Sequence, residues 1–157
     1  MEIDLTLLGG TLSPRNPLAD DRRVAELAGR ASLLARPWLA LQLGGYTRTH
    51  STVVARERWS ALLLGAEVRP AFAAAPIRAV LSASLMPLVT VTGAAHPSFA
   101  FAGATGLEWQ ASHFTAAFTY RVERYDFPRA GTLKRAEQFS TLSARLGWLI
   151  GARPRGR

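Results

Sequence analysis

Three histidines, each close to a serine, are the residues of this chain whose types and spacing could do hydrolytic chemistry. The pairs are His50 with Ser51, His96 with Ser98, and His113 with Ser112. A serine nucleophile needs a base within hydrogen-bond reach and a third group that orients the base. No acidic residue stands at a convincing spacing from any pair, so we expect three solvated loop histidines, no catalytic residue and no enzymatic activity.

The composition excludes several other kinds of site. The chain has 157 residues and no cysteine, which excludes disulfides, thiol catalysis and cysteine-rich zinc sites. The sequence contains no metal-ligand cluster, phosphate loop or nucleotide motif, and we expect no cofactor. Its length predicts a single domain over residues 1–157, with a basic C-terminal tail at 152–157. The longest nearly uncharged stretches are shorter than the ~18 apolar residues of a membrane-spanning helix.

Apolar residues recur at every second position, which is the spacing of a β-strand with two different faces. Between 141 and 150, for example, Leu142, Leu146 and Trp148 alternate with Ser143 and Arg145. The same pattern predicts eight strands, at residues 2–7, 25–33, 39–46, 58–72, 77–91, 99–109, 114–124 and 141–150. Strands of about ten residues are long enough to cross a membrane when they are tilted.

The connections between these strands are predicted to alternate in length. Short turns are expected at 35–37, 73–76 and 110–113, and longer loops at 11–23, 47–57, 93–98 and 125–138. An up-and-down meander has all its turns at one end and all its loops at the other. The predicted fold class is therefore all-β, an eight-stranded antiparallel up-and-down transmembrane β-barrel. Pro87 interrupts one strand, and we expect a tolerated bulge there rather than a lateral seam.

The polar face of the predicted strands decides which side is inside. It carries small residues mixed with nearly equal numbers of acids and bases, which suits a crowded barrel interior because buried charges must be paired. The charged residues expected in this lumen are Glu26, Arg30, Glu67, Arg69, Arg78, Glu108, Arg121, Glu123 and Arg145. A soluble lipocalin-like ligand-binding barrel, with the apolar face inside, is the alternative.

Aromatic residues gather near the ends of the predicted strands. Two such bands, separated by leucine, alanine and valine, are typical of the interfacial girdles of a membrane barrel. The girdle residues are predicted to be Trp38, Phe72, Trp109, Phe114 and Trp148 at the turn ends and Trp59, Phe99 and Phe101 at the loop ends.

With its strand pattern and layered aromatic residues, the chain resembles the small eight-stranded outer-membrane β-barrels of Gram-negative bacteria, the class of the OmpA membrane domain and OmpX. The last strand also resembles the C-terminal assembly signal of that class, at Arg145, Gly147, Ile150 and Ala152. The resemblance implies a monomer in the bacterial outer membrane, with the lipid bilayer and the outer-membrane assembly machinery as partners. It also implies a signal peptide, and residues 1–10 do not form one because they are acidic and already alternate.

The net charge of +8 comes largely from the predicted loops. By the same resemblance these loops are extracellular, where arginine forks would meet the phosphates of lipopolysaccharide. The residues expected to make this contact are Arg22, Arg23, Arg56, Arg58, Arg129, Lys134 and Arg135. Solvated loops without a ligand are the alternative, and nucleic acid is not expected because no aromatic residues interleave with the arginines.

The predicted function is therefore that of an integral outer-membrane barrel with a side-chain-filled lumen. Its role would be structural, or one of surface interaction through the basic loops. The enzymatic alternative is an outer-membrane lipid A-modifying acyl hydrolase or acyltransferase. That alternative requires His96 or His50 to face lipid beside a serine.

Overall fold

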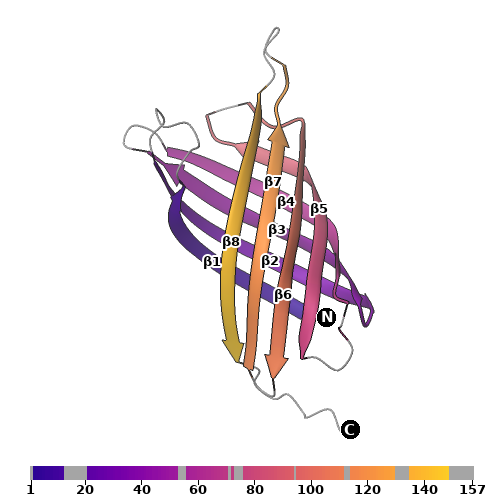
Figure 1. Cartoon of the computed structure of the whole chain (residues 1–157). Helices are drawn as coiled ribbons and strands as arrows, with labels where there is room; N and C mark the ends of the chain where they lie inside the picture. The colour runs from indigo at the N-terminus through magenta and orange to yellow at the C-terminus, as the bar shows by residue number, and fades with distance from the viewer. Residues whose placement is uncertain are drawn as a thin grey trace.

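The computed structural model describes residues 2–12, 21–52, 56–70, 72, 76–93, 95–111, 114–129 and 135–148, which form strands and connections but no helix (Figure 1). The strands are β1 (Glu2–Leu12), β2 (Arg22–Arg36), β3 (Leu39–Ser51), β4 (Arg56–Val68), β5 (Ile77–Val91), β6 (Phe99–Ala111), β7 (Phe114–Asp126) and β8 (Ala136–Trp148). Within these ranges nothing forms a helix long and apolar enough to cross a membrane. The all-β prediction is confirmed.

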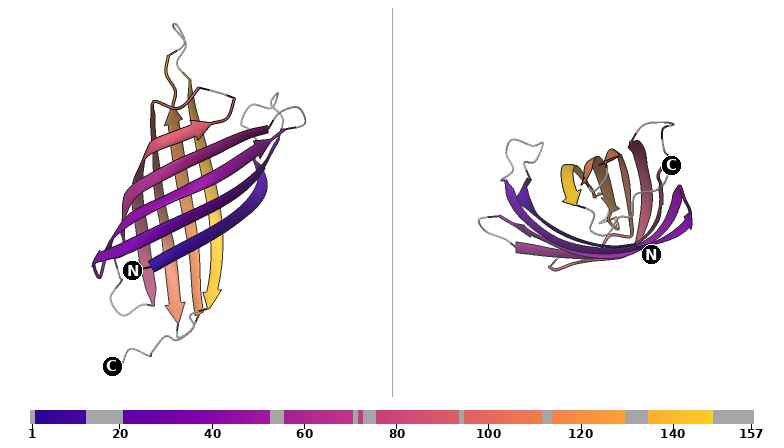
Figure 2. Two further views of the ribbon diagram at one scale, coloured as in Figure 1. Left: turned by 180° about the vertical axis from the view of Figure 1, so that it is seen from behind. Right: turned by 90° about the horizontal axis from the view of Figure 1, so that it is seen from below.

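Each strand pairs antiparallel with its neighbour in the chain, in the order β1 to β8, so the predicted up-and-down meander is confirmed. The four strands β1–β4 run obliquely to β5–β8 (Figure 1), and the sheet curls so that these two halves face each other (Figure 2). Among the described residues no ladder joins β1 to β8. The sheet is therefore a half-barrel with two free edges.

The predicted alternation of short and long connections holds except on the two sides of β4, where it is reversed. At the loop end, β3 continues to Ser51 and β4 begins at Arg56, whereas at the turn end β4 already stops at Val68 and β5 begins at Ile77. The connection at 52–55 is consequently shorter than the one at 69–76. The long loops at 47–57 and 125–138 were predicted because their polar residues hide the two-residue period, although the strands extend into both.

The faces of the strands follow the predicted parity over most of the sheet. Leucine and other large apolar side chains point to the exposed convex side, as Leu5, Leu7 and Leu142 do at the two edges. Glu26, Glu67 and other charged side chains point to the concave side and are buried. This arrangement is the reverse of a water-soluble sheet, whose apolar face is covered and whose polar face is wet.

Pro87 lies in a bulge, as expected. Leu62 pairs with Leu88 and Leu64 pairs with Leu85, so a single residue of β4 lies opposite two residues of β5. A bulge removes the ladder bond that proline cannot make and shifts the strand by one residue. Val89 and Val91 therefore face the buried interior. The two-residue period of the predicted strand at 77–91 would place both on the outer face with Leu85, so that part of the prediction is wrong.

The apolar core fills the loop-end half of the concave side. Its buried members come from both facing halves of the sheet: Tyr46, Trp59, Ala61, Met86, Val89, Val91, Ala100, Ala102, Tyr125 and Phe127. The core fixes the distance between the two halves, and the charged groups of the interior pack against it.

The close approach of β6 and β7 requires glycine at Gly106, where a Cβ would lie 3.0 Å from the Cα of Thr119.

Candidate functional site

Arg48 is the centre of a buried charge network in the loop-end half of the interior. Its Nε donates to Glu26 Oε2 at 2.6 Å, and its Nη1 donates to Glu123 Oε2 at 2.6 Å. Arg121 lies 2.6 Å from the other carboxylate oxygen of Glu123. Because Arg48 belongs to β3 and Glu123 to β7, the guanidinium joins the two facing halves of the sheet. Glu26, Arg48 and Glu123 are all less than a tenth exposed.

The central position of Arg48 was missed by the sequence analysis, which placed it in a loop at 47–57. The structure continues β3 through it, and Tyr46, Arg48 and His50 all point to the interior. Their even numbers continue the polar face of Ala40 and Gln42, so the two-residue period itself contained the signal. Polar residues at a strand end obscured it because they are equally typical of a loop.

Two tyrosines extend this network across the interior. The hydroxyls of Tyr46 and Tyr125 are hydrogen-bonded to each other, and Tyr125 donates to Glu123 Oε2 at 2.9 Å. Trp59 packs edge-on against Tyr125, with ring centroids 5.0 Å apart. Trp59 is only 1% exposed, so its predicted place in the outer aromatic girdle is wrong. Its odd number puts it on the same face as Ala61, which points inward.

Glu67 is the centre of a second network, in the turn-end half of the interior. It accepts from Gln42 Nε2 at 2.9 Å and from Arg30 at 3.4 Å, and it also pairs with Arg69. Arg30 reaches on to Asp4 at 3.0 Å. Arg145 of β8 lies 4.0 Å from the same Asp4, so this network connects the two free edges of the sheet.

The other predicted lumen charges remain outside both networks. Arg78 donates to Gln110 at 2.8 Å instead of pairing with Glu108, although the two residues lie opposite each other in the ladder. Glu108 forms no ion pair with any described residue. The residues that the structure brings together in the two networks are Asp4, Glu26, Arg30, Arg48, Glu67, Arg69, Arg121, Glu123 and Arg145.

The aromatic residues predicted as girdles lie mainly on the outer face. Trp38, Phe72, Phe99, Phe101 and Trp109 are exposed large hydrophobic residues. Phe114 is partly buried against Trp109, with ring centroids 5.8 Å apart. Trp148 ends β8, and its side chain lies outside the described residues.

The predicted basic residues divide into two groups by position. Arg22 and Arg23 begin β2, and Arg56 begins β4, so the prediction that these three lie in loops is wrong. Arg58 lies in β4, within the predicted strand at 58–72. Arg129 and Arg135 lie between β7 and β8, where both are exposed. Lys134 lies outside the described residues.

Neither His50 nor His96 is hydrogen-bonded to the serine near it in the sequence. His96 Nδ1 accepts a hydrogen bond from the Val91 amide at 3.1 Å, whereas Ser98 Oγ donates to the Asp126 carbonyl at 3.1 Å. His50 is buried between Trp59 and Phe139, and it is not the solvated loop residue that we expected. Ser112 and His113 lie outside the described residues. Within the described ranges no three metal-binding side chains lie together.

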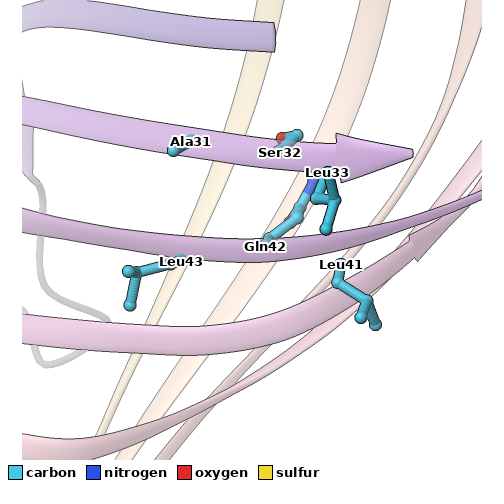
Figure 3. A pocket seen from close by; sticks show the side chains of 6 residues that line it. All are labelled: Ala31, Ser32, Leu33, Leu41, Gln42 and Leu43. Atoms are coloured by element: carbon cyan, nitrogen blue, oxygen red, sulfur yellow. The ribbon is translucent and has the colours of Figure 1, made fainter. Parts of the chain in front are cut away.

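A shallow depression lies on β2 and β3 near the turn end. Its lining residues are Ala31, Ser32, Leu33, Leu41, Gln42 and Leu43 (Figure 3). The lining is mostly apolar, and three of its six residues are leucines of the outer face. Its one hydroxyl, Ser32 Oγ, is buried without a hydrogen-bond partner among the described residues, so no base is in place to activate it.

Comparison with known proteins identifies no relative, since no family model, curated protein or solved structure matches the chain.

Proposed function

We propose that this chain is an integral outer-membrane β-barrel whose lumen is filled by side chains. The observation that carries the proposal is the outer face, on which all eight strands expose large apolar side chains. Leu7 on β1 is 84% exposed, and each of the other seven strands also exposes a leucine or phenylalanine. Water-soluble monomers rarely expose a continuous apolar surface, whereas lipid favours one.

The lengths of the strands fit this environment. Six of the strands have 13 residues or fewer and two have 15. At about 3.3 Å per residue a 13-residue strand is about 43 Å long, and a tilt of about 36–45° makes it cover about 30–35 Å. That distance matches the hydrocarbon thickness of a bilayer.

The interior supports a structural or surface-interaction role rather than a channel. Arg48 reaches from β3 to Glu123 on the opposite half, and Trp59 and Tyr125 pack beside it. An eight-stranded barrel has room inside for little more than its own side chains. Buried carboxylates and guanidinium groups that satisfy each other also explain why charged residues can face this interior at all.

A membrane-spanning sheet must also close, because unpaired backbone groups at its edges are costly in lipid. We propose that β1 and β8 pair with Asp4 opposite Arg145, the two residues that already approach each other across the edges. One continuous row of the sheet then runs through paired residues: Ile3, Ala31, Leu43, Leu64, Leu85, Phe101, Arg124 and Gln138.

The stagger of that row supports the closure. With Asp4 opposite Arg145, Gln138 lies opposite Thr11, which is eight residues beyond the starting point of the row at Ile3. A barrel of eight strands whose register is displaced by eight residues around the circumference has a strand tilt of about 36°, which lies within the range of natural barrels. The same register puts Leu7 beside Leu142 on the outer face, so both edges contribute to one apolar surface.

The test is refolding with and without detergent, followed by electrophoresis in dodecyl sulfate with and without boiling. We expect a heat-dependent change of mobility only for protein refolded in detergent micelles. A soluble, monomeric β-protein formed without detergent would overturn the proposal and would favour a ligand-binding barrel. Incubation of the folded protein with a phosphorylated acylated lipid should release no fatty acid, and release would favour the enzymatic alternative.

A further inference from the structure

Three exposed arginines lie together on the outer face, at the loop ends of β2 and β4. The ladders align Arg23 with Ser51, and Ser51 with Arg56. The next outward row aligns Thr49 with Arg58. Arg23, Arg56 and Arg58 are therefore presented by two strands that flank the hydroxyl groups of β3. We call these three residues the arginine patch.

The arginine patch has no acidic partner among the described residues, unlike two other arginines of the loop end. Arg124 pairs with Asp126 at 3.2 Å, and Arg135 pairs with Glu137. By contrast, no ion pair within the described ranges includes a residue of the patch. Glu57, which stands between Arg56 and Arg58, belongs to the inward face, and its carboxylate accepts from Trp59 Nε1.

The surface directly below the arginine patch changes from polar to apolar within a few residues. Thr47 and Ser60 form the next outward row and are hydrogen-bonded to each other at 3.3 Å. The rows after it present Leu62, and then Leu43 beside Leu64. Arginines above hydroxyl groups and leucines below them match the order of headgroup and hydrocarbon at the surface of a bilayer.

We infer that the arginine patch binds the phosphate group of an anionic lipid in the surrounding leaflet. This inference rests on the proposed function, because it requires that the leucine rows lie in hydrocarbon. Guanidinium groups bind phosphate oxygens with two parallel hydrogen bonds, and the hydroxyls of Thr49 and Ser51 can donate further ones. Within the described strands, the rows next to the patch carry no outward carboxylate to compete for the arginines. The ligand that suits three unpaired guanidinium groups is a lipid with an exposed phosphate monoester.

The experiment uses the full chain refolded in detergent micelles, with phosphatidic acid as the probe. Bound lipid is counted by native mass spectrometry and compared with phosphatidylcholine of the same acyl chains. We expect phosphatidic acid to bind more tightly to the wild-type protein. Combining Arg23→Ala, Arg56→Ala and Arg58→Ala should weaken its binding roughly 100-fold. The matched control is Arg36→Ala, which removes an exposed arginine at the opposite end of β2 and should leave binding unchanged.

Each outcome has a distinct meaning. Equal binding by the triple variant and the wild type would overturn the inference, and so would equal binding of the two lipids. Competition by glycerol phosphate at the same concentration as phosphatidic acid would also overturn it, because the site would then take free phosphate. If the triple variant loses its heat-dependent mobility, the single variant Arg58→Ala takes its place, with a smaller loss expected. Failure of the wild type itself to fold in micelles would count against the proposed function instead.

Discussion

The two charge networks of the interior have similar parts and very different surroundings. At the loop end, Arg48 lies between two carboxylates, and all three groups are almost completely buried. At the turn end, Glu67 is equally buried, but its partner Arg30 is about one third exposed and Arg145 is 62% exposed. The loop-end network therefore acts in a low dielectric, whereas the turn-end network is partly screened by solvent.

This difference separates two tasks of a filled interior. The loop-end network joins β2, β3 and β7 across the interior, so it holds the two halves of the sheet together. The turn-end network reaches both free edges through Asp4, so it holds the edges near each other. A charge cluster that is buried on all sides should dominate stability, and one at an open edge should mainly determine which strands meet.

The largest effect is expected at the centre of the loop-end network. Arg48→Met would leave Glu26 buried without a cation and Glu123 with Arg121 as its only cation among the described residues. We expect a loss of about 5 kcal/mol in the free energy of unfolding, the upper end for a broken buried ion pair, because two buried carboxylates each lose the Arg48 guanidinium. The measurement is urea unfolding in micelles, followed by the heat-dependent mobility of the folded band. Combining Arg48→Met with Glu26→Gln and Glu123→Gln should recover part of the loss, and no recovery would contradict the charge-based explanation.

The aromatic residues beside Arg48 should come next. Trp59→Ala opens a cavity against Tyr125, Phe127 and Phe139, and we expect a loss of about 3–4 kcal/mol in the same unfolding experiment. Trp109→Ala, on the outer face at the turn end, is the matched control and should cost clearly less. Equal losses for the two variants would place Trp59 in the outer girdle after all.

A smaller effect is expected at the turn end. Glu67→Gln keeps the hydrogen bond from Gln42 but removes the charge that Arg30 and Arg69 share. We expect a loss of about 1–3 kcal/mol, because the arginines are partly hydrated already. Glu108→Gln provides the control, with a change within about 0.5 kcal/mol, since Glu108 forms no ion pair with the described residues. A loss as large as that of Arg48→Met would contradict the contrast between the two networks.

The sequence alone was sufficient for the topology and for most of the face assignments. A two-residue period constrains a whole strand at once, because a shift of one residue would move all of its side chains to the opposite face. It correctly placed Glu26, Glu67 and Glu123 inside and the leucines outside. The bulge at Pro87 was expected, but the faces of Val89 and Val91 were assigned wrongly, because a bulge reverses the parity of the residues that follow it in the same strand. Nothing in the alternation reveals where the extra residue is accommodated.

The partners within the interior could not be predicted in the same way. Periodicity assigns a face but gives no distance between strands that are far apart in the sheet. Arg48 and Glu123 are separated by β4, β5 and β6 along the chain, and only the curling of the sheet brings them together. The opposition of Arg78 and Glu108 shows the converse, since these ladder neighbours are not paired. The number of inward-facing charges could be predicted from the sequence, but the pairs that they form could not.

The smallest effect on stability, and the sharpest test of the turn-end network, concerns the two edges. If β1 and β8 close with Asp4 opposite Arg145, Leu7 and Leu142 become direct neighbours on the outer face. Directly opposite residues of an antiparallel pair have Cα atoms about 4.5–5.5 Å apart, which is within the range of a disulfide. Leu7→Cys with Leu142→Cys should therefore oxidise within one molecule in micelles, and the chain contains no other cysteine to compete.

The control pair, Leu7→Cys with Leu146→Cys, uses the same face but is displaced along β8 by four residues, about 13 Å. It should remain reduced in the folded protein. Equal oxidation of both pairs would mean that the edges have no fixed register, and bands of twice the mass would mean that they pair with a second copy. Asp4→Asn should slow formation of the first disulfide while changing the free energy of unfolding by about 1 kcal/mol or less, because both arginines that pair with Asp4 are partly hydrated. A network that sets register in this way would affect which strands meet far more than how stably the sheet is folded.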